Sequence, residues 1–324
     1  MTGWGVLVAA VLMVLAVPWL GWTYQATLML SFFAYAVVLL GVNLLFGYTG
    51  LLSFGQALFL GLGAYTSAVL PAMFGVRHME AILLVAVVVA LLMAAPVGAL
   101  CVRYVKIYFG MLTLAFGMVF YSFLLKFYHL TGGDEGLRVL RPFLLGFDLG
   151  RTPKMVFLTG PYYYYAAAVL CLATAVMWRI VTSPFGLCLR TIRENPEKAA
   201  SLGISVARYR WYAFLIAAVY AAVGGALLGP TIGQVDPGLV YWTQSGNLVF
   251  MTILGGFTHF FGPILGALVF IYLQDAVMSV VPYWRLIFGA ILAVLVIFLP
   301  EGLMGLRRWR IGHSGQPAVR VGSQ

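Results

Sequence analysis

One polar island interrupts an otherwise apolar chain, and it reads Ser183-Pro-Phe-Gly-Leu-Cys-Leu-Arg-Thr-Ile-Arg-Glu-Asn-Pro-Glu-Lys-Ala-Ala-Ser-Leu-Gly-Ile-Ser-Val-Ala-Arg-Tyr-Arg210. Basic residues outnumber acidic ones in it, and apolar runs too long for the core of a soluble domain flank it on both sides. Apolar segments of about 20 residues, the length that crosses a bilayer as a helix, recur along the whole chain. We therefore interpret the island as a loop between membrane helices where another protein docks.

The composition predicts an all-α polytopic membrane protein. Hydrophobic residues make up 63% of the chain and charged residues only 9%, whereas soluble domains carry about 25% charged residues. A membrane β-barrel would instead show short alternating segments. The net charge of +10 is distributed over several loops rather than gathered in one basic domain, as expected for cytoplasmic loops, so we expect no nucleic-acid partner.

The apolar pattern predicts about ten transmembrane helices in a single membrane domain. The third and eighth are rich in glycine, and we expect them to be broken or re-entrant. The expected spans are 4–20, 26–46, 51–73, 81–101, 107–127, 161–181, 211–229, 245–258, 261–281 and 285–300. The membrane domain then covers residues 1–306, with an external loop at 128–160 and a basic cytoplasmic tail at 307–324.

Ten crossings place both termini and the polar island on one side of the membrane. Most of the Lys and Arg residues lie on that side, and the positive-inside rule assigns it to the cytoplasm. The N-terminal apolar stretch lacks a basic region before it, so we expect a retained first span rather than a cleaved signal.

The island itself carries two helix starts and one helix stop. Ser183-Pro184 and Asn195-Pro196 each combine an N-cap residue with proline at the first helical position. Gly203 can adopt the left-handed conformation that ends a helix. We therefore expect one helix over about 184–194 and another over 196–202. The second is too short to be stable alone, so packing must hold it.

Part of this loop resembles a known motif. The segment Arg193-Glu-Asn-Pro-Glu-Lys-Ala-Ala-Ser-Leu-Gly-Ile204 resembles the EAA-type cytoplasmic loop of ABC importer permeases, in which alanines precede a glycine that ends a short coupling helix. More narrowly, it is similar to the loop of LivM-type permeases for branched-chain amino acids. The chain departs from that family at Pro196-Glu197-Lys198, where an acid-and-alanine run is usual, and at Gln56, where the family often has His.

Other segments support the resemblance and extend it from about residue 26 to 306. The glycine-rich stretch from Asn43 to Tyr65 is similar to the family's segment around a G-x-x-S-x-G-x-A core. The remaining matches, in chain order, are Leu112-Thr-Leu-Ala-Phe-Gly117, Thr131-Gly-Gly-Asp-Glu-Gly-Leu137, Gly255-Gly256 and Phe261-Gly-Pro-Ile-Leu-Gly266.

The resemblance implies a fold, a function and partners. The fold would be that of a type II ABC importer-like permease, multi-pass in the bacterial cytoplasmic (inner) membrane. The chain would translocate branched-chain or related amino acids delivered by a periplasmic or extracellular binding protein. Its partners in the bilayer would be a related second permease and two P-loop ATPase subunits. ATP and Mg²⁺ would be bound by those ATPases, and this chain would hold no cofactor.

Three groups of residues are candidates for ATPase coupling, for the translocation pathway and for external contacts. The residues expected to couple to the ATPase are Arg190, Arg193, Glu194, Glu197, Ala199, Ala200, Leu202 and Gly203. The polar residues that could line a translocation pathway, or simply pack between helices, are Ser53, Gln56, Tyr65 and Thr66. The external-loop residues that could meet a binding protein or substrate, or form an ordinary turn, are Thr131, Gly132, Gly133 and Asp134.

Absent motifs exclude catalysis by this chain. It contains no Gly-Lys dipeptide and hence no P-loop, and it has no metal-ligand spacing. An ion- or proton-coupled secondary transporter is the alternative class, but it needs an ionisable residue near the middle of a span, and Lys126 and Asp275 lie near span ends. An ABC permease for urea or amides is the other alternative.

Overall fold

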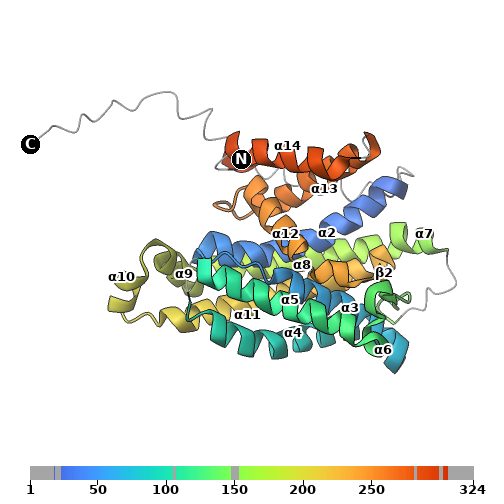
Figure 1. The fold of residues 1–324 in the computed structure, drawn as a ribbon, viewed down its shortest axis with the longest axis horizontal. Helices are drawn as coiled ribbons and strands as arrows, with labels where there is room; N and C mark the ends of the chain where they lie inside the picture. The colour runs from blue at the N-terminus through green and yellow to red at the C-terminus, as the bar shows by residue number, and fades with distance from the viewer. Residues whose placement is uncertain are drawn as a thin grey trace, which may run out of the picture.

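The described part of the chain is a bundle of long helices that run side by side (Figure 1). The long helices are α2 (Thr23–Asn43), α3 (Gln56–Phe74), α4 (Met79–Cys101), α5 (Ile107–Lys126), α8 (Tyr163–Thr182), α11 (Val206–Ile232), α12 (Trp242–Gly255), α13 (Gly262–Val280) and α14 (Trp284–Phe298). The computed structural model describes Pro18 and residues 23–104, 107–146, 153–280, 283–298 and 302–305. The expected first span and the C-terminal tail therefore lie outside the described residues.

Shorter elements extend or connect these helices. The π-helical turn η2 (Leu44–Thr49) continues α2, while α7 (Lys154–Phe157) and η4 (Leu158–Tyr162) run directly into α8. The elements in the connecting segments are α6 (Tyr128–Thr131), η3 (Gly133–Glu135), β1 (Leu137–Arg138), α9 (Pro184–Glu194), α10 (Pro196–Ser201), β2 (Gln234–Val235), η5 (Pro237–Val240) and η6 (Leu303–Gly305).

The prediction of an all-α polytopic protein is confirmed. Among the described residues, 7 helical segments are long and apolar enough to cross a membrane. The helices α12 and α14 are apolar but shorter, with 14 and 15 residues. The described residues thus do not confirm ten spans, although every expected span after the first coincides with one of these helices.

Two expected spans begin later or end earlier than the apolar pattern indicates. Residues 50–55, the start of the expected third span, form no helix, and α3 begins only at Gln56. The expected eighth span is the short helix α12. Both were expected to be broken or re-entrant. The third span has non-helical backbone before α3, whereas α12 is one unbroken helix that ends at Gly255.

Two other spans are longer than expected because proline did not end them. The span that was expected to begin at Pro161 starts at Lys154 and passes that proline in the π-helical turn η4. Proline donates no backbone hydrogen bond, and a π turn changes the bonding pattern around it so that the helix continues. Helix α11 likewise includes Pro230, three residues before its left-handed C-cap Gly233.

The core of the bundle is α11, which packs against α2, α3 and α4. Its buried face consists largely of alanine and glycine, and small residues let membrane helices approach closely where the hydrophobic effect does not drive association. At Gly225 the approach is so close that an added Cβ would overlap the Leu60 carbonyl of α3. In the same way, a Cβ added at Gly63 of α3 would overlap the Ala222 carbonyl of α11.

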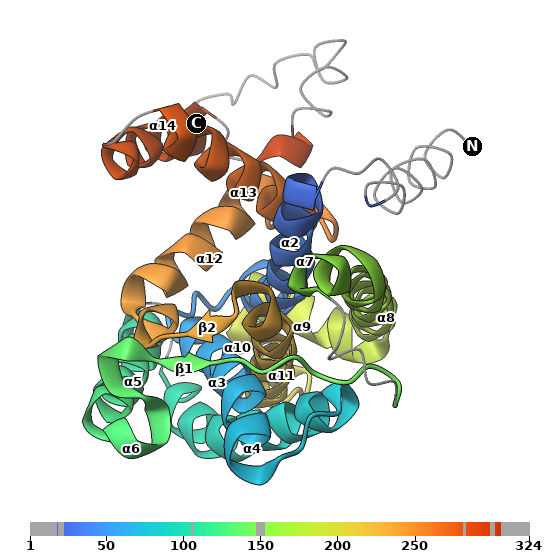
Figure 2. The same ribbon diagram turned by 90° about the vertical axis from the view of Figure 1, so that its right-hand side faces the viewer.

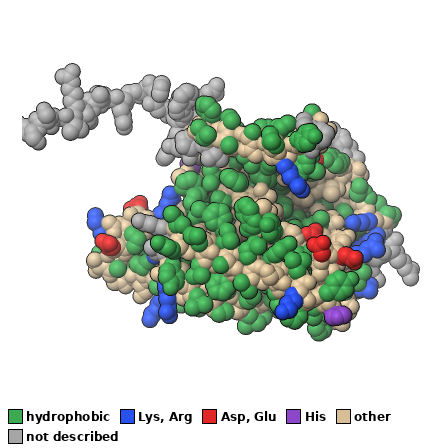
Figure 3. Space-filling model, in the orientation of Figure 1, with side chains coloured by type: hydrophobic (Ala, Val, Ile, Leu, Met, Phe, Trp, Pro, Cys, Tyr) green, Lys and Arg blue, Asp and Glu red, His purple; other side chains and the backbone are tan. Residues whose placement is uncertain are grey.

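The two ends of the bundle have different structures. Helices α9 and α10 form one end, and α6, α7 and the β1–β2 pair lie at the other (Figures 1 and 2). Leu137 pairs with Val235 and Arg138 with Gln234 in antiparallel register. Loops that the sequence predicts on one side of the membrane therefore meet at one end. On the face that Figure 3 shows, charged side chains gather towards these ends and hydrophobic ones cover the middle.

Candidate functional site

The polar island folds as two helices, as its sequence predicts, and the second of them has a side-chain cap. Helix α9 ends at Glu194 and α10 begins at Pro196, and the Asn195 Oδ1 between them accepts hydrogen bonds from the backbone N–H groups of Glu197 (3.1 Å) and Lys198 (3.0 Å). Gly203 follows in the left-handed region at φ 84°. Ser183 occupies the N-cap position of α9, but its hydroxyl donates to the Ile180 carbonyl (2.6 Å) instead of capping.

The cap on α10 leads to a first prediction. Replacing Asn195 by alanine removes both cap hydrogen bonds, and losing such a cap costs about 1 kcal/mol. We expect α10 to fray, so that amide hydrogen exchange at Glu197 and Lys198 becomes about fivefold faster. Asn195→Ser, which can still accept a hydrogen bond, should exchange almost as slowly as the native chain. Equal protection in Asn195→Ala and the native chain would contradict the prediction.

Helix α10 is held by its own chain and presents a free face. It packs against α9 and the start of α11, with Ala199 fully buried at 0% exposure. Ala200 and Gly203 are exposed, and the Leu202 side chain is 76% exposed. Glu194 and Glu197 are also exposed. An apolar side chain at the surface of a polar loop is available for contact with another protein.

Arg193 connects α9 to two other parts of the chain. Its guanidinium Nη1 donates a hydrogen bond to the Gly47 carbonyl in the last turn of η2. Cations that hydrogen-bond the last carbonyls of a helix also interact favourably with its dipole. The same guanidinium lies over the Phe257 ring, 5.5 Å from its centroid, in the loop between α12 and α13.

The end of α2 and the α12–α13 loop are also joined directly to each other. The Phe46 and Phe257 rings lie 4.5 Å apart between centroids, and the Asn43 Nδ2 is 3.4 Å from the His259 carbonyl. The two segments are so close that a Cβ at Gly47 would overlap the Phe257 carbonyl. We call this group of residues (43, 46, 47, 193, 257 and 259) the Arg193 junction.

The Arg193 junction brings together three segments that the sequence singles out separately: the glycine-rich stretch 43–65, the island, and the glycines 255–266. Next to it, the Arg190 guanidinium lies 5.0 Å from the centroid of the Tyr48 ring. Gly50 closes the turn at φ 75°, where an added Cβ would lie 3.1 Å from Arg193 Cγ. Sequence reasoning missed the aromatic partners, because no pattern shows which rings lie under a distant arginine.

The polar residues proposed for a pathway lie inside the chain. Ser53, Gln56, Tyr65 and Thr66 are all buried, and none lines either of the two pockets described below. Thr66 donates its hydroxyl to the Leu62 carbonyl (2.7 Å), which is ordinary helix bonding. The Gln56 amide and the Tyr65 hydroxyl have no hydrogen-bond partner in the described chain, and leaving such groups unpaired costs about 1–3 kcal/mol each. Their pathway role stays a prediction.

The non-helical residues 50–55 form one wall of a pocket of about 380 Å³. Gly50, Leu52 and Phe54 line this wall. The opposite wall is the start of α5, including Gly110 and Met111. This pocket lies beside the Arg193 junction, since Gly50 lines the pocket and is next to the Arg193 side chain.

The external-loop residues form a tight, internally bonded turn. The Thr131 hydroxyl is buried within hydrogen-bonding distance of the Leu124 carbonyl (2.5 Å), and it accepts a hydrogen bond from Gly133 N–H (3.3 Å). Gly132 and Gly133 both have positive φ. Only Asp134 of the four is exposed. The turn therefore has a structural role, and contact with a binding protein stays a prediction that rests on Asp134.

No group of three or more His, Cys, Asp or Glu side chains in the described ranges is arranged to hold a metal ion.

The sequence matches the family described as "Branched-chain amino acid transport system / permease component" over residues 24–298. No solved structure matches the chain.

Individual relatives agree with this family. The chain is 28% identical to the high-affinity branched-chain amino acid transport system permease protein LivM of Escherichia coli K12, over 92% of this chain and 74% of that protein. It is 24% identical to the corresponding permease protein LivH of the same strain, over 84% of this chain and 91% of LivH. A nucleoside ABC transporter permease, NupC of Lactococcus lactis, shares 36% identity over only 32% of this chain and 28% of its own length.

Proposed function

Because this chain belongs to the family of branched-chain amino acid transport system permease components, we propose that it is one of two membrane subunits in an ATP-driven importer. The second membrane subunit would be a LivH-like permease, since LivM and LivH are both similar to this chain and are permeases of the same kind of system. Two P-loop ATPases would power transport, and an external binding protein would deliver branched-chain or related amino acids. The complex would lie in the bacterial inner membrane with both termini in the cytoplasm.

The observation that carries the proposal is the connection between an exposed helix and the membrane core. Helix α10 offers Leu202 and Ala200 to a partner on one side, and α9 reaches the end of α2 and the α12–α13 loop through Arg193 on the other. An ATPase that moved α10 would thus move two glycine-rich parts of the membrane domain together. We propose that this is how nucleotide-driven closure of the ATPases switches access across the membrane.

The position of the one buried charged side chain argues against an ion-coupled transporter. Such a transporter needs an ionisable residue in the membrane interior, usually paired and facing a cavity. Among the described residues, Arg210 is the one charged side chain in the buried class. It is the last residue of the island and lies near the beginning of α11, away from the middle of the span.

A crosslinking experiment tests the coupling role. In a chain whose Cys101, Cys171 and Cys188 are replaced by serine, Leu202→Cys should crosslink to a co-expressed P-loop ATPase, and ATP should change the yield. Ala199→Cys is the matched control, three residues away but fully buried, and it should crosslink about tenfold less or not at all. Equal yields from both positions, or none from Leu202→Cys in a transport-active complex, would refute the proposal.

The substrate is tested separately in proteoliposomes that contain the complete complex and its binding protein. We expect ATP-dependent uptake of leucine, isoleucine or valine. Uptake of urea or short amides without uptake of these amino acids would replace the substrate assignment and leave the ABC permease role intact.

A further inference from the structure

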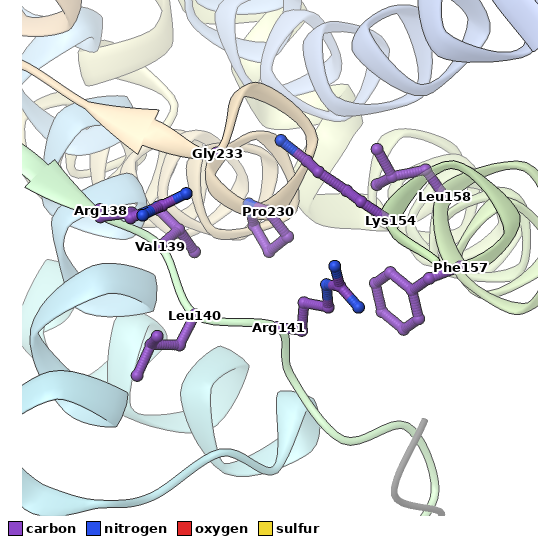
Figure 4. A pocket seen from close by; sticks show the side chains of 9 residues that line it. All are labelled: Arg138, Val139, Leu140, Arg141, Lys154, Phe157, Leu158, Pro230 and Gly233. Carbon is purple, nitrogen blue, oxygen red and sulfur yellow. The ribbon is translucent and has the colours of Figure 1, made fainter. Parts of the chain in front are cut away.

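A basic pocket of about 180 Å³ lies at the end of the bundle opposite to α9 and α10. Its lining includes the cationic side chains Arg138, Arg141 and Lys154, which come from β1, the segment after it, and the first turn of α7. Figure 4 shows Arg138 and Lys154 reaching towards Pro230 from opposite sides. No Asp or Glu is among the 9 described residues that line the pocket, so its walls concentrate positive charge.

The backbone holds these cations in place. Arg138 pairs with Gln234 in the two-stranded sheet, and the next residue, Val139, donates its N–H to the Gly233 carbonyl (3.0 Å). Gly233 also makes room for Lys154, because a Cβ there would lie 2.6 Å from the Lys154 Nζ. Arg138 and Lys154 are exposed side chains of like charge, and an anion between them is attracted to both. The volume is several times the about 30 Å³ that a water molecule occupies.

Two membrane helices end at this pocket, which places it at the level of lipid headgroups. Lys154 is the first residue of the span Lys154–Thr182, and Gly233 directly follows the last residue of the span Val206–Ile232. The headgroup layers occupy the few ångströms on either side of the about 30 Å hydrocarbon core. Phosphate groups of lipids lie in that layer, within reach of the pocket.

The side of the pocket formed by α7 carries exposed apolar side chains, as a surface that faces lipid does. Only 22% of the apolar window in the span Lys154–Thr182 is buried inside the chain. Met155 and Val156, next to Lys154, are exposed apolar side chains. Acyl chains can therefore lie along α7 and α8 while the attached phosphate reaches the cations. An acidic protein segment would have no use for these exposed apolar residues.

We propose that the basic pocket binds the phosphate of an anionic phospholipid. Arg138 offers a planar fork of N–H donors that suits a phosphate, and Lys154 adds a point charge from the opposite wall. The floor, which includes Phe157, Leu158 and Pro230, contacts the glycerol and the first methylene groups. The pocket also gives a reason for basic residues in a loop that the sequence predicts to be external.

Native mass spectrometry of the purified full-length chain tests this proposal, with phosphatidylglycerol and phosphatidylcholine as competing probes. The native chain should retain phosphatidylglycerol preferentially. Arg138→Gln combined with Lys154→Gln should weaken that retention about 30-fold, and Lys154→Gln alone about fivefold. The matched control is Lys126→Gln combined with Arg285→Gln, because neither residue lines the pocket; it should retain the lipid like the native chain. Melting temperatures in phosphatidylcholine show that each variant is folded.

Separate arms distinguish other sources of the anion. Inorganic phosphate should not displace phosphatidylglycerol, and displacement at equal affinity would make the pocket a free-phosphate site and overturn the proposal. Equal lipid retention by the native chain and the double variant, or displacement by a poly-glutamate peptide, would overturn it as well.

Discussion

The Gly225→Ala variant of this permease is expected to fail to fold. Gly225 lies where α11 crosses α3, and the added methyl group would overlap the Leu60 carbonyl oxygen. Neither group can rotate away, because the position of a Cβ is fixed by its own helix and the carbonyl is part of the α3 backbone. The two helices would have to separate along the most extensive contact in the bundle. We expect a loss of several kcal/mol, comparable with the about 5–15 kcal/mol that stabilises a typical protein, and therefore no monodisperse peak in fluorescence-detected size-exclusion chromatography.

The same substitution elsewhere provides the control. Gly117 is in the middle of α5 and has nothing within 4 Å of an added Cβ. Gly117→Ala should therefore raise the melting temperature or leave it unchanged, since alanine is favoured over glycine in a helix by about 1 kcal/mol. A native melting temperature for Gly225→Ala would show that the α3–α11 contact is looser than described.

The second large effect is expected at the Arg193 junction. Arg193→Gln removes a hydrogen bond from a charged donor to the Gly47 carbonyl and the cation over the Phe257 ring. Together these contacts stabilise the junction by about 2 kcal/mol or more. We expect ATP-driven uptake by the reconstituted complex to fall about 30-fold or more. The ATPase subunits should still bind and hydrolyse ATP, because the exposed face of α10 is unchanged.

Neighbouring variants separate this effect from a general loss of positive charge. Arg190→Gln removes the contact of a cation with one residue, Tyr48. A cation over a ring at an exposed site contributes about 0.5–1 kcal/mol, so this variant should lower uptake less than about fivefold. Arg193→Lys keeps the charge but loses the planar guanidinium, so it should be intermediate. Equal losses for the two arginines would contradict a special role for Arg193. Loss of ATPase binding in Arg193→Gln would mean that the residue supports α10 instead of transmitting its movement.

Local signals predicted the island better than any other part of the molecule. Asn195, Pro196 and Gly203 each act within a few residues, so the cap, the helix start and the left-handed stop follow from neighbouring atoms. The apolar runs predicted where the membrane helices lie, because length and hydrophobicity alone define a span. Their ends were less certain, since Pro161 and Pro230 lie inside helices instead of ending them.

The parts that could not be predicted depend on contacts between distant residues. Arg193 and Phe257 are 64 positions apart in the sequence, and nothing near either residue indicates the other. The basic pocket likewise combines Arg138 and Lys154 with Pro230. Ala199 is a further case, because the alanine pattern that suggested a docking face does not show which alanine faces inwards.

The non-helical segment 50–55 affects how long the protein survives in a cell. Backbone that is not helical leaves polar groups to be satisfied by their surroundings, and hydrocarbon cannot do so. The N–H groups of Phe54 and Gly55 are bonded within the chain. The pocket lined by Gly50, Leu52 and Phe54 is a place where water or another protein can satisfy the remaining groups, and we expect membrane proteases to attack first a chain that lacks this cover.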